Sequence, residues 1–600
     1  METSLFDSKQ ATGPSLLPSS QAPVPLLKTR STFARKLLVS LGIIIYGAYI
    51  WRCTHANGLN LGQLKQDGEG EARCAQSDVL IPEKNGDLWR SLSVTFGTED
   101  FKKRAVDWLG GAVRVPTESY DDLGHLDEDP RWDAFGPFHD YLLDVFPRVH
   151  ETLKLTKVNT YGLLYVWEGS DSLLKPLVLA AHQDVVPVNP TTVDQWTHPP
   201  YSGYFDGERI WGRGSSDDKS GLIGALSGVE SLIEGGFKPT RTVVLAFGFD
   251  EEVSGRQGAQ KLVEVLLDRY GKNGVALVVD EGGGFGENYG SVVAVPGIGE
   301  KGYTDTRVEV NTPGGHSSVP PKHTSIGILA ALLVEYEAHP FKLELSRRDP
   351  FYSTLQCVAE HGKDLPESLR KTIKRSWSSN KALLTLEKEI SKNPVYKALV
   401  ETTQAIDIVQ GGVKANALPE QAWALINHRV SVISSVGETQ AHDAKIIEGL
   451  AEKFNLTFNA FGTKLSKEAF GAPSSGSLTL SDAHPGTALE PAPITPTLGK
   501  EATPYKLLSG TIKATYNSHR DLTGANEIVV SPGMMSGNTD TRYYWDLSKH
   551  IFRYSHINAG SGTGLGNVHT VDESLGINEF VEMIRFFATL ILNADEATDL

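Results

Sequence analysis

The sequence predicts an α/β protein: a mostly parallel-sheet domain, interrupted by an inserted α+β lid domain and preceded by one transmembrane helix. Three observations lead to this prediction. Apolar strands alternate with helices from about residue 89, the pattern changes after residue 302, and residues 37–51 contain no charge. The pattern of the first part resumes after residue 473, so an inserted lid explains the order better than two consecutive domains.

The uncharged stretch at residues 37–51 is predicted to be a membrane anchor. Its fifteen residues would rise about 22 Å as a helix, so the flanking Arg35, Lys36 and Arg52 must snorkel to the interfaces. More basic residues precede the stretch than follow it. This bias predicts a cytosolic tail at 1–36, a signal anchor at 37–51 and a luminal linker at 52–88. A buried helix and a cleaved signal peptide are less favoured, because the preceding polar region is long and no small-residue cleavage motif follows.

The first part of the main domain, residues 89–302, reads as a sheet covered on both faces. Strands are predicted at 174–182, 241–249 and 275–280, and helices at 220–236 and 259–271. Continuous apolar strands separated by helices are typical of parallel sheets. Ligands of such sheets bind at the carboxyl ends of the strands.

The lid is predicted over residues 303–472, as a small sheet with two helices on one face. Its elements are an edge strand at 304–312, a helix at 324–339, a strand at 421–432 and a helix at 439–454. The main domain resumes over 473–600, beginning with a loop at 473–505 and ending in a helix at 577–593.

Charge and cysteine content exclude some functions. The 600 residues include 57 basic and 73 acidic side chains, a net charge of −16, which gives no general attraction to nucleic acid. Three cysteines allow at most one disulfide and no all-cysteine zinc site. The sequon at Asn455 is compatible with exposure to a lumen.

Acidic and histidine side chains follow the predicted strands and gather at one edge of the sheet. So many acids would repel one another unless a cation were present. Imidazole and carboxylate without thiolate suit zinc or another borderline divalent metal. Two histidines and three carboxylates serve two ions only if one carboxylate bridges, which leaves each ion an open position for water. The set comprises His182, Asp184, Asp217, Asp218, Glu251, Glu252, Asp280 and His569.

Five segments resemble the aminoacylase/carboxypeptidase family of co-catalytic zinc peptidases: AAHQDVVPV, GRGSSDDKSG, FDEEVSG, VVDEGG and GNVHTVDE. The resemblance spans about residues 90–595 and implies two Zn²⁺ per subunit. His182, Asp217 and Asp280 would hold the first ion, and Asp217, Glu252 and His569 the second.

The resemblance also implies the catalytic groups near the metals. Glu251 would be the general base and acid, and Asp184 would orient His182. The adjacent Asp218 is better explained as a helix N-cap or supporting group than as a ligand.

Lid residues are implied by two further segments. TPGGHSSVPP resembles the family's lid motif, whose histidine, here His316, reaches the reaction intermediate. VKANALPEQAWALINHR matches the family's substrate-binding asparagine and arginine, here Asn416 and Arg429.

The implied function is a zinc metallocarboxypeptidase that removes the C-terminal residue of short peptides through a metal-bound hydroxide. The alternative is an N-acyl-amino-acid hydrolase of the same fold. A non-catalytic scaffold is disfavoured because no ligand is missing. The predicted anchor and the long insertion around 345–400 resemble vacuolar members of the family, so we expect a single-pass endomembrane protein with a luminal body. We also consider a homodimer formed through the lid.

Overall fold

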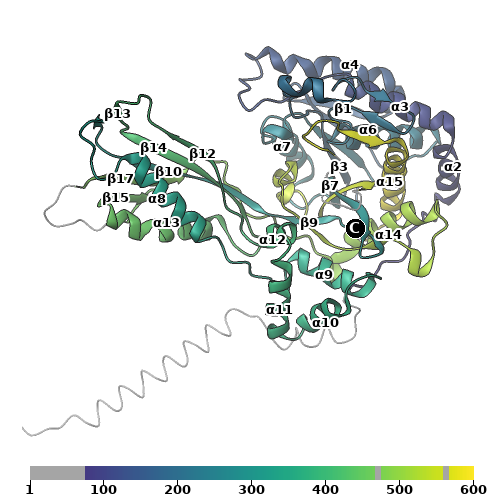
Figure 1. Cartoon of the computed structure of the whole chain (residues 1–600). Coiled ribbons are helices and arrows are strands. Elements are labelled where there is room, and N and C mark those ends of the chain that lie inside the picture. The colour runs from purple at the N-terminus through teal and green to yellow at the C-terminus, as the bar shows by residue number, and fades with distance from the viewer. Residues whose placement is uncertain (1–73, 466–473, 559–566) are drawn as a thin grey trace, which may run out of the picture. The chain divides into compact units, whose positions relative to one another are not determined.

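The main domain is built on a mixed sheet (Figure 1). A computed structural model describes residues 74–465, 474–558 and 567–600, and within them ten strands join this sheet. Its main path is β1 (Lys154–Val158), β2 (Gly162–Trp167), β6 (Val243–Gly248), β3 (Leu177–His182), β7 (Leu277–Asn288), β20 (Ile551–Asn558), β9 (Gly297–Glu300) and β19 (Gly533–Met535). Off this path, β8 (Ser291–Ala294) pairs with β7, and β18 (Val529–Val530) pairs with β8.

The prediction of a mostly parallel sheet holds for its centre and for two short outer pairs, β18–β8 and β19–β9, while β20–β9 is antiparallel. β6, β3, β7 and β20 are parallel neighbours, whereas β1–β2, β2–β6 and β7–β8 are antiparallel. Short turns join β1 to β2 and β7 to β8, and so short a connection permits only antiparallel pairing.

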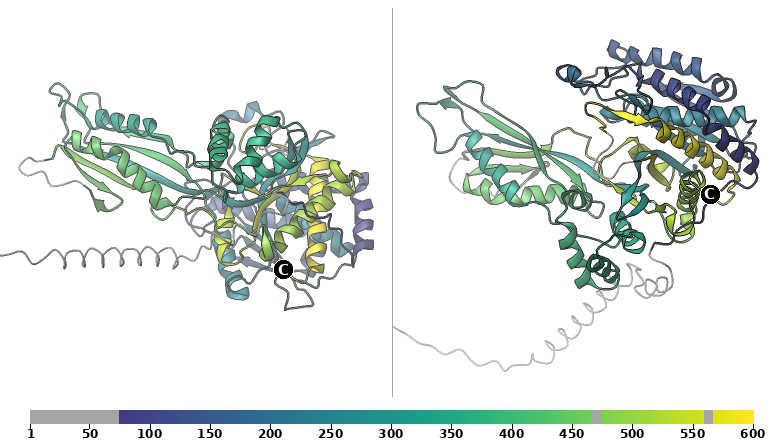
Figure 2. Two further views of the ribbon diagram at one scale, coloured as in Figure 1. Left: turned by 90° about the horizontal axis from the view of Figure 1, so that it is seen from below. Right: turned by 45° about the vertical axis from the view of Figure 1, so that its right-hand side comes forward.

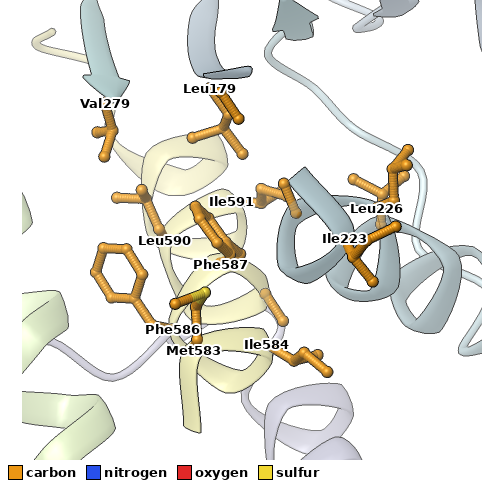
Figure 3. Close-up of a cluster of buried hydrophobic side chains, with 14 of the residues drawn as sticks. Leu179, Ile223, Leu226, Val279, Met583, Ile584, Phe586, Phe587, Leu590 and Ile591 are labelled. Atoms are coloured by element: carbon orange, nitrogen blue, oxygen red, sulfur yellow. The ribbon is translucent and has the colours of Figure 1, made fainter. Parts of the chain in front are cut away.

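Helices cover both faces of the sheet, as the buried strands require. Leu179 of β3 and Val279 of β7 face Leu590 of α15, with Ile223 of α6 beside them (Figure 3), and Val178 packs toward α7 on the opposite face. The first face is covered by α2 (Gly86–Phe96), α3 (Glu99–Val113), α4 (Phe135–Val145), α5 (Pro147–Thr152), α6 (Lys219–Glu234), α14 (Thr503–Ser518) and α15 (Ile577–Glu596). The second is covered by α7 (Ala259–Tyr270).

A separate three-stranded sheet joins two distant parts of the main domain. It consists of β4 (Tyr204–Phe205), β5 (Arg209–Trp211) and β21 (Ser574–Gly576). Since β5 precedes the loop that holds Asp217 and β21 follows the loop that holds His569, their pairing brings both loops together. Short helical turns are η1 (Pro130–Ala134), η2 (Pro190–Gln195), η3 (Glu251–Val253), η4 (Gly499–Ala502), η5 (Gly524–Asn526) and η6 (Asp540–Asp546).

The lid contains a second sheet. Within the described residues its order is β12 (Ala405–Gly411), β14 (Gln421–Val430), β10 (Gly302–Asn311), β17 (Gly476–Asp482), β15 (Leu456–Ala460) and β16 (Thr463–Lys464). The helices α8 (Ser325–Ala338) and α13 (Val436–Lys453) run alongside these strands and share their core (Figure 2).

Two predictions for the lid are wrong. The strand predicted at the edge, β10, lies between β14 and β17, and β17 itself forms from residues predicted to be a loop. In β10 the ion-paired Arg307 and Glu309 alternate with the buried Val308 and Val310. Because one face of the sheet is polar, an interior strand resembles an edge strand in sequence.

Further elements belong to the lid insertion. The strands β11 (Gly315–His316) and β13 (Ala417–Leu418) form a short pair. Four helices lie in sequence between α8 and β12, and their core includes Met534 of the main domain. They are α9 (Pro350–His361), α10 (Glu367–Ser376), α11 (Asn380–Ile390) and α12 (Pro394–Val400).

The chain before α2 is bonded to both the lid insertion and the main domain. Cys74 forms a disulfide with Cys357 of α9, which is the single bridge that three cysteines allow. The Leu80 N–H donates to the Gly510 carbonyl at 3.0 Å, and Asn593 donates to the Leu80 carbonyl at 2.8 Å. The part of the predicted linker that the structure describes therefore packs as part of the domain.

The predicted tail and anchor lie outside the described residues. Among the helices that the structure does describe, none has the length and apolarity to span a bilayer.

Candidate metal centre

One histidine and several acids of the candidate site come from the carboxyl ends of three adjacent parallel strands, β6, β3 and β7. His182 is the last residue of β3, Glu251 and Glu252 form η3 directly after β6, and Glu281 follows the stretch of β7 that pairs with β3. Strands that are parallel neighbours end at one edge of a sheet, so these side chains are brought together by the sheet itself.

Asp217 lies between the two histidines. Its Oδ1 is 3.2 Å from His182 Nε2, and its Oδ2 is 3.1 Å from His569 Nε2. One carboxylate thus presents a separate oxygen to each imidazole, which is the arrangement that a bridging ligand needs.

Glu252 completes the second group of donors. Its Oε2 is 3.3 Å from His569 Nε2, and the donor atoms of His182, Asp217 and Glu252 lie within 4.8 Å of one another. The structure therefore brings together four of the five residues predicted as ligands: His182, Asp217, Glu252 and His569.

At the fifth predicted ligand, the structure favours the next residue. Glu281 Oε1 is 3.6 Å from His182 Nε2, and Glu281 belongs to a group of donor atoms with His182 and Asp218. Asp280 belongs to neither group. The pairing between β7 and β20 explains why: Arg553 opposes Asp280, but the next residue of β20 opposes Gly283, so β7 bulges by two residues here. In the sequence, the segment VVDEGG offers two adjacent acids, and its pattern does not show which of them faces the site.

Asp184 forms hydrogen bonds with residues at the ends of two neighbouring strands, β3 and β6. Its backbone carbonyl accepts a hydrogen bond from His182 Nδ1 at 2.9 Å, which leaves Nε2 free to bind a metal. Its fully buried carboxylate accepts the N–H groups of Glu251 and Glu252, each at 3.1 Å, and the Ser119 hydroxyl at 2.7 Å. Asp184 thus positions His182 and both glutamates.

Asp218 caps a helix. It is the N-cap of α6, and its Oδ1 accepts the Gly221 N–H at 3.2 Å, in agreement with the capping role expected for it.

The electrostatics of the cluster fit a divalent cation. Burial raises the pKa of Glu251 and of Glu281, and hydrogen bonds with Asp217 and Glu252 raise the pKa of His569 to about 10. The acids are thus shifted toward their neutral forms, and the histidine beside them toward its charged form. The buried Glu252 Oε1 also has no hydrogen-bond partner among the described residues. A cation would neutralise the acids and use this oxygen, so the donor set fits a metal cofactor.

The predicted lid residues lie in two places. His316 is exposed on β11, and Asn416 directly precedes the paired strand β13, where the Ser317 N–H donates to the Asn416 carbonyl at 3.3 Å. Within the described residues no hydrogen bond or ion pair joins either side chain to the metal-site acids. Arg429 instead contacts the main domain: its Nη1 donates to Asn538 Oδ1 at 3.1 Å.

A carboxylate between two histidines, beside the strand ends of an α/β sheet, is typical of metal-dependent hydrolases. The model of peptidase family M20/M25/M40 matches residues 178–593. Carboxypeptidase S of Saccharomyces cerevisiae is 42% identical over 589 residues, which cover 97% of this chain and 99% of that protein. The N-fatty-acyl-amino acid synthase/hydrolase of Mus musculus is 30% identical over 493 residues, which cover 81% of this chain and 87% of that protein.

Solved structures show the same fold. Human carnosine dipeptidase 1 matches with a TM-score of 0.55 at 14% identity, covering 86% of this chain and all of that one (100%). An M20 family metallo-carboxypeptidase from Sulfolobus solfataricus matches with a TM-score of 0.52 at 16% identity, covering 82% of this chain and 98% of that one. The chain belongs to peptidase family M20/M25/M40, and the predicted class of metallopeptidase is confirmed.

Proposed function

We propose that this protein is a zinc metallocarboxypeptidase that removes the C-terminal residue from short peptides. The observation that carries the proposal is the position of Asp217, which offers one oxygen toward His182 and the other toward His569. Glu281 takes the ligand position that the sequence assigned to Asp280. The similarity to carboxypeptidase S over nearly the whole chain supports the choice of substrate class.

The residues divide the chemistry of amide hydrolysis. Two bound Zn²⁺ ions would supply Lewis-acid activation of water and of the scissile carbonyl. Glu251 accepts the proton of the attacking water and returns it to the leaving amine. Asp184 holds the backbone of Glu251 in place for both transfers.

Lid residues contact the substrate in this proposal. Arg429 is half-buried at the junction with Asn538, and its planar guanidinium matches the terminal carboxylate of a peptide. His316 is exposed on β11, so it reaches the reacting carbonyl through a movement of the lid.

The experiment compares blocked dipeptides with N-fatty-acyl amino acids as substrates. We expect dipeptide hydrolysis that chelator abolishes and Zn²⁺ restores. Glu251→Gln should lower kcat at least about a hundredfold and leave the bound metal in place. Glu264→Gln, at an exposed acid of α7, is the matched control. Dipeptide hydrolysis that persists in the Glu251 variant contradicts the proposal.

The same panel tests the second candidate function, N-acyl-amino-acid hydrolysis. It is favoured by the similarity to the mouse N-fatty-acyl-amino acid synthase/hydrolase. Preference for fatty-acyl substrates, with the same dependence on metal and on Glu251, would select this function.

A second copy of the chain is the partner proposed for the lid. β12 pairs with β14 on one side and is an edge strand on the other, where another chain could pair with it. Large apolar side chains are exposed on β12 and on α8: Ile326, Val334, Ile408 and Val409. We expect a dimer by light scattering and a monomer for Val409→Lys. A monomeric wild-type protein contradicts this.

A luminal location and an N-terminal anchor are also proposed. The Cys74–Cys357 disulfide supports an oxidising compartment such as the endomembrane lumen or vacuole. Asn455 is exposed directly before β15 and Thr457 is exposed within it, so the sequon is accessible. We expect a glycosidase-sensitive shift in mobility that Asn455→Gln abolishes, and release from membranes by detergent but not by salt. An unmodified protein that salt extracts contradicts both points.

A further inference from the structure

Glu573 is a fully buried carboxylate to which the reaction proposed above assigns no role. It lies four residues after His569. Its Oε1 accepts the N–H groups of Ser216 at 2.9 Å and Asp217 at 3.1 Å, and its Oε2 accepts Arg213 Nη1 at 2.7 Å. All three donors come from the loop that presents the bridging Asp217.

The loop that carries His569 has an unfavourable backbone. Three of its residues adopt left-handed conformations: Asn567 at φ 62°, His569 at φ 62° and Asp572 at φ 64°. Residues other than glycine seldom adopt this backbone conformation, so contacts with the rest of the protein must stabilise the loop. Asp572 is held by Thr197, whose N–H and hydroxyl donate at 2.6 and 2.8 Å, and Glu573 is held by the Asp217 loop.

We propose that Glu573 is a positioning residue that sets the separation between Asp217 and His569. Both residues are ligands in the proposed function, on which this inference rests. The Glu573 carboxylate accepts the backbone N–H of one ligand, Asp217, and three residues of chain separate Glu573 from the other ligand, His569. The β5–β21 pairing next to it, in which Ser574 opposes Trp211, fixes the ends of both loops.

The chemistry of the side chain explains why a carboxylate occupies this position. Two N–H groups and a guanidinium converge on it, and a carboxylate accepts from all three. A glutamine would turn its NH₂ group toward at least one of these donors. Glu573→Gln therefore keeps the size of the side chain but weakens its hydrogen bonds with the Asp217 loop.

The test is stepwise metal binding by the full-length protein after chelator treatment. Titration of wild type with Zn²⁺ should show two binding steps. In Glu573→Gln we expect the weaker step to lose about ten- to a hundredfold in affinity, as is usual when the support of a ligand is removed. The Co²⁺-loaded protein should show an altered visible spectrum, which loss of stability alone would not cause. Glu208→Gln, an exposed acid in the turn between β4 and β5, is the matched control and should bind as wild type does.

Arg213→Lys keeps the proposal testable if Glu573→Gln does not fold. It alters only the partner of Oε2, and the bonds of Oε1 to Ser216 and Asp217 remain. We expect both binding steps to stay within about threefold of wild type. A loss of tenfold or more in Arg213→Lys would overturn the proposal, because the buried ion pair would then be the feature that matters.

Two further results have separate meanings. Unchanged affinities and Co²⁺ spectrum in a folded Glu573→Gln overturn the positioning role alone. A wild-type protein that binds fewer than two ions overturns the proposed metal centre itself, and with it this inference.

Discussion

The metal-site edge of the main domain and the lid differ in how firmly they hold their predicted residues. In the main domain, side chains from separate segments meet within 3.1 to 3.6 Å, and buried partners such as Asp184 fix them. In the lid, His316 is exposed, and its ring nitrogen Nδ1 pairs with the nearby Ser318 hydroxyl at 2.7 Å. Residues at the strand ends of one sheet are positioned by that sheet, whereas lid residues depend on where the lid itself lies.

The largest effect is expected when the two adjacent acids of β7, Asp280 and Glu281, are substituted one at a time. Glu281→Gln should lower kcat at least about a hundredfold and reduce the metal bound per chain, because Glu281 faces His182. Asp280→Asn should retain the full metal content. Metal analysis and steady-state kinetics on both variants provide the measurement. The reverse result would return the ligand to Asp280.

His316→Ala tests the lid side of the comparison. If His316 stabilises the reacting oxygen, kcat should fall by about a hundredfold. Metal content and thermal stability should not change, since the side chain is exposed and lies on the lid. Unchanged kcat would leave His316 without a part in the reaction.

Arg429→Lys should have a smaller effect, on substrate binding. A lysine keeps the charge but cannot form the two parallel bonds of a guanidinium with a carboxylate. We expect KM for peptides with a free C-terminus to rise about tenfold, which corresponds to about 1.4 kcal/mol, with little change in kcat. An equal effect on C-terminally amidated peptides would argue against carboxylate recognition.

The smallest effect expected concerns stability in the helical insertion of the lid. Asp349 is the buried N-cap of α9, and burial raises its pKa to about 7, although the Phe351 N–H donates to it. The folded state therefore favours the protonated carboxyl group of Asp349. The stability that folding gains from this protonation is fully present below about pH 4 and is lost as the pH rises through about 7.

Asp349→Asn should thus stabilise the protein above about pH 7 and make little difference near pH 4, because asparagine keeps the cap without the charge. A melting temperature higher by roughly one to three degrees at pH 8 is expected. A stabilisation of the same size at both pH values would contradict this origin.

The sequence by itself predicted the family and the α/β core, and it named most of the residues that meet at the candidate metal site. His182 and the glutamates after β6 follow apolar strands, and such strands align in one sheet whatever the rest of the chain does. The surplus of acids also predicted a bound cation before any distance was known. Side-chain type and strand periodicity are local properties, so they can be read without the fold.

Tertiary structure decided the features that depend on distant partners. Glu281 faces the site instead of Asp280 because β7 bulges against β20, a strand about 270 residues away in the chain. β10 lies inside the lid sheet because β17 pairs with its free side. Cys74 forms a disulfide with Cys357, which is 283 residues away in the sequence. Such pairings follow from the packing of whole elements, which no local pattern records.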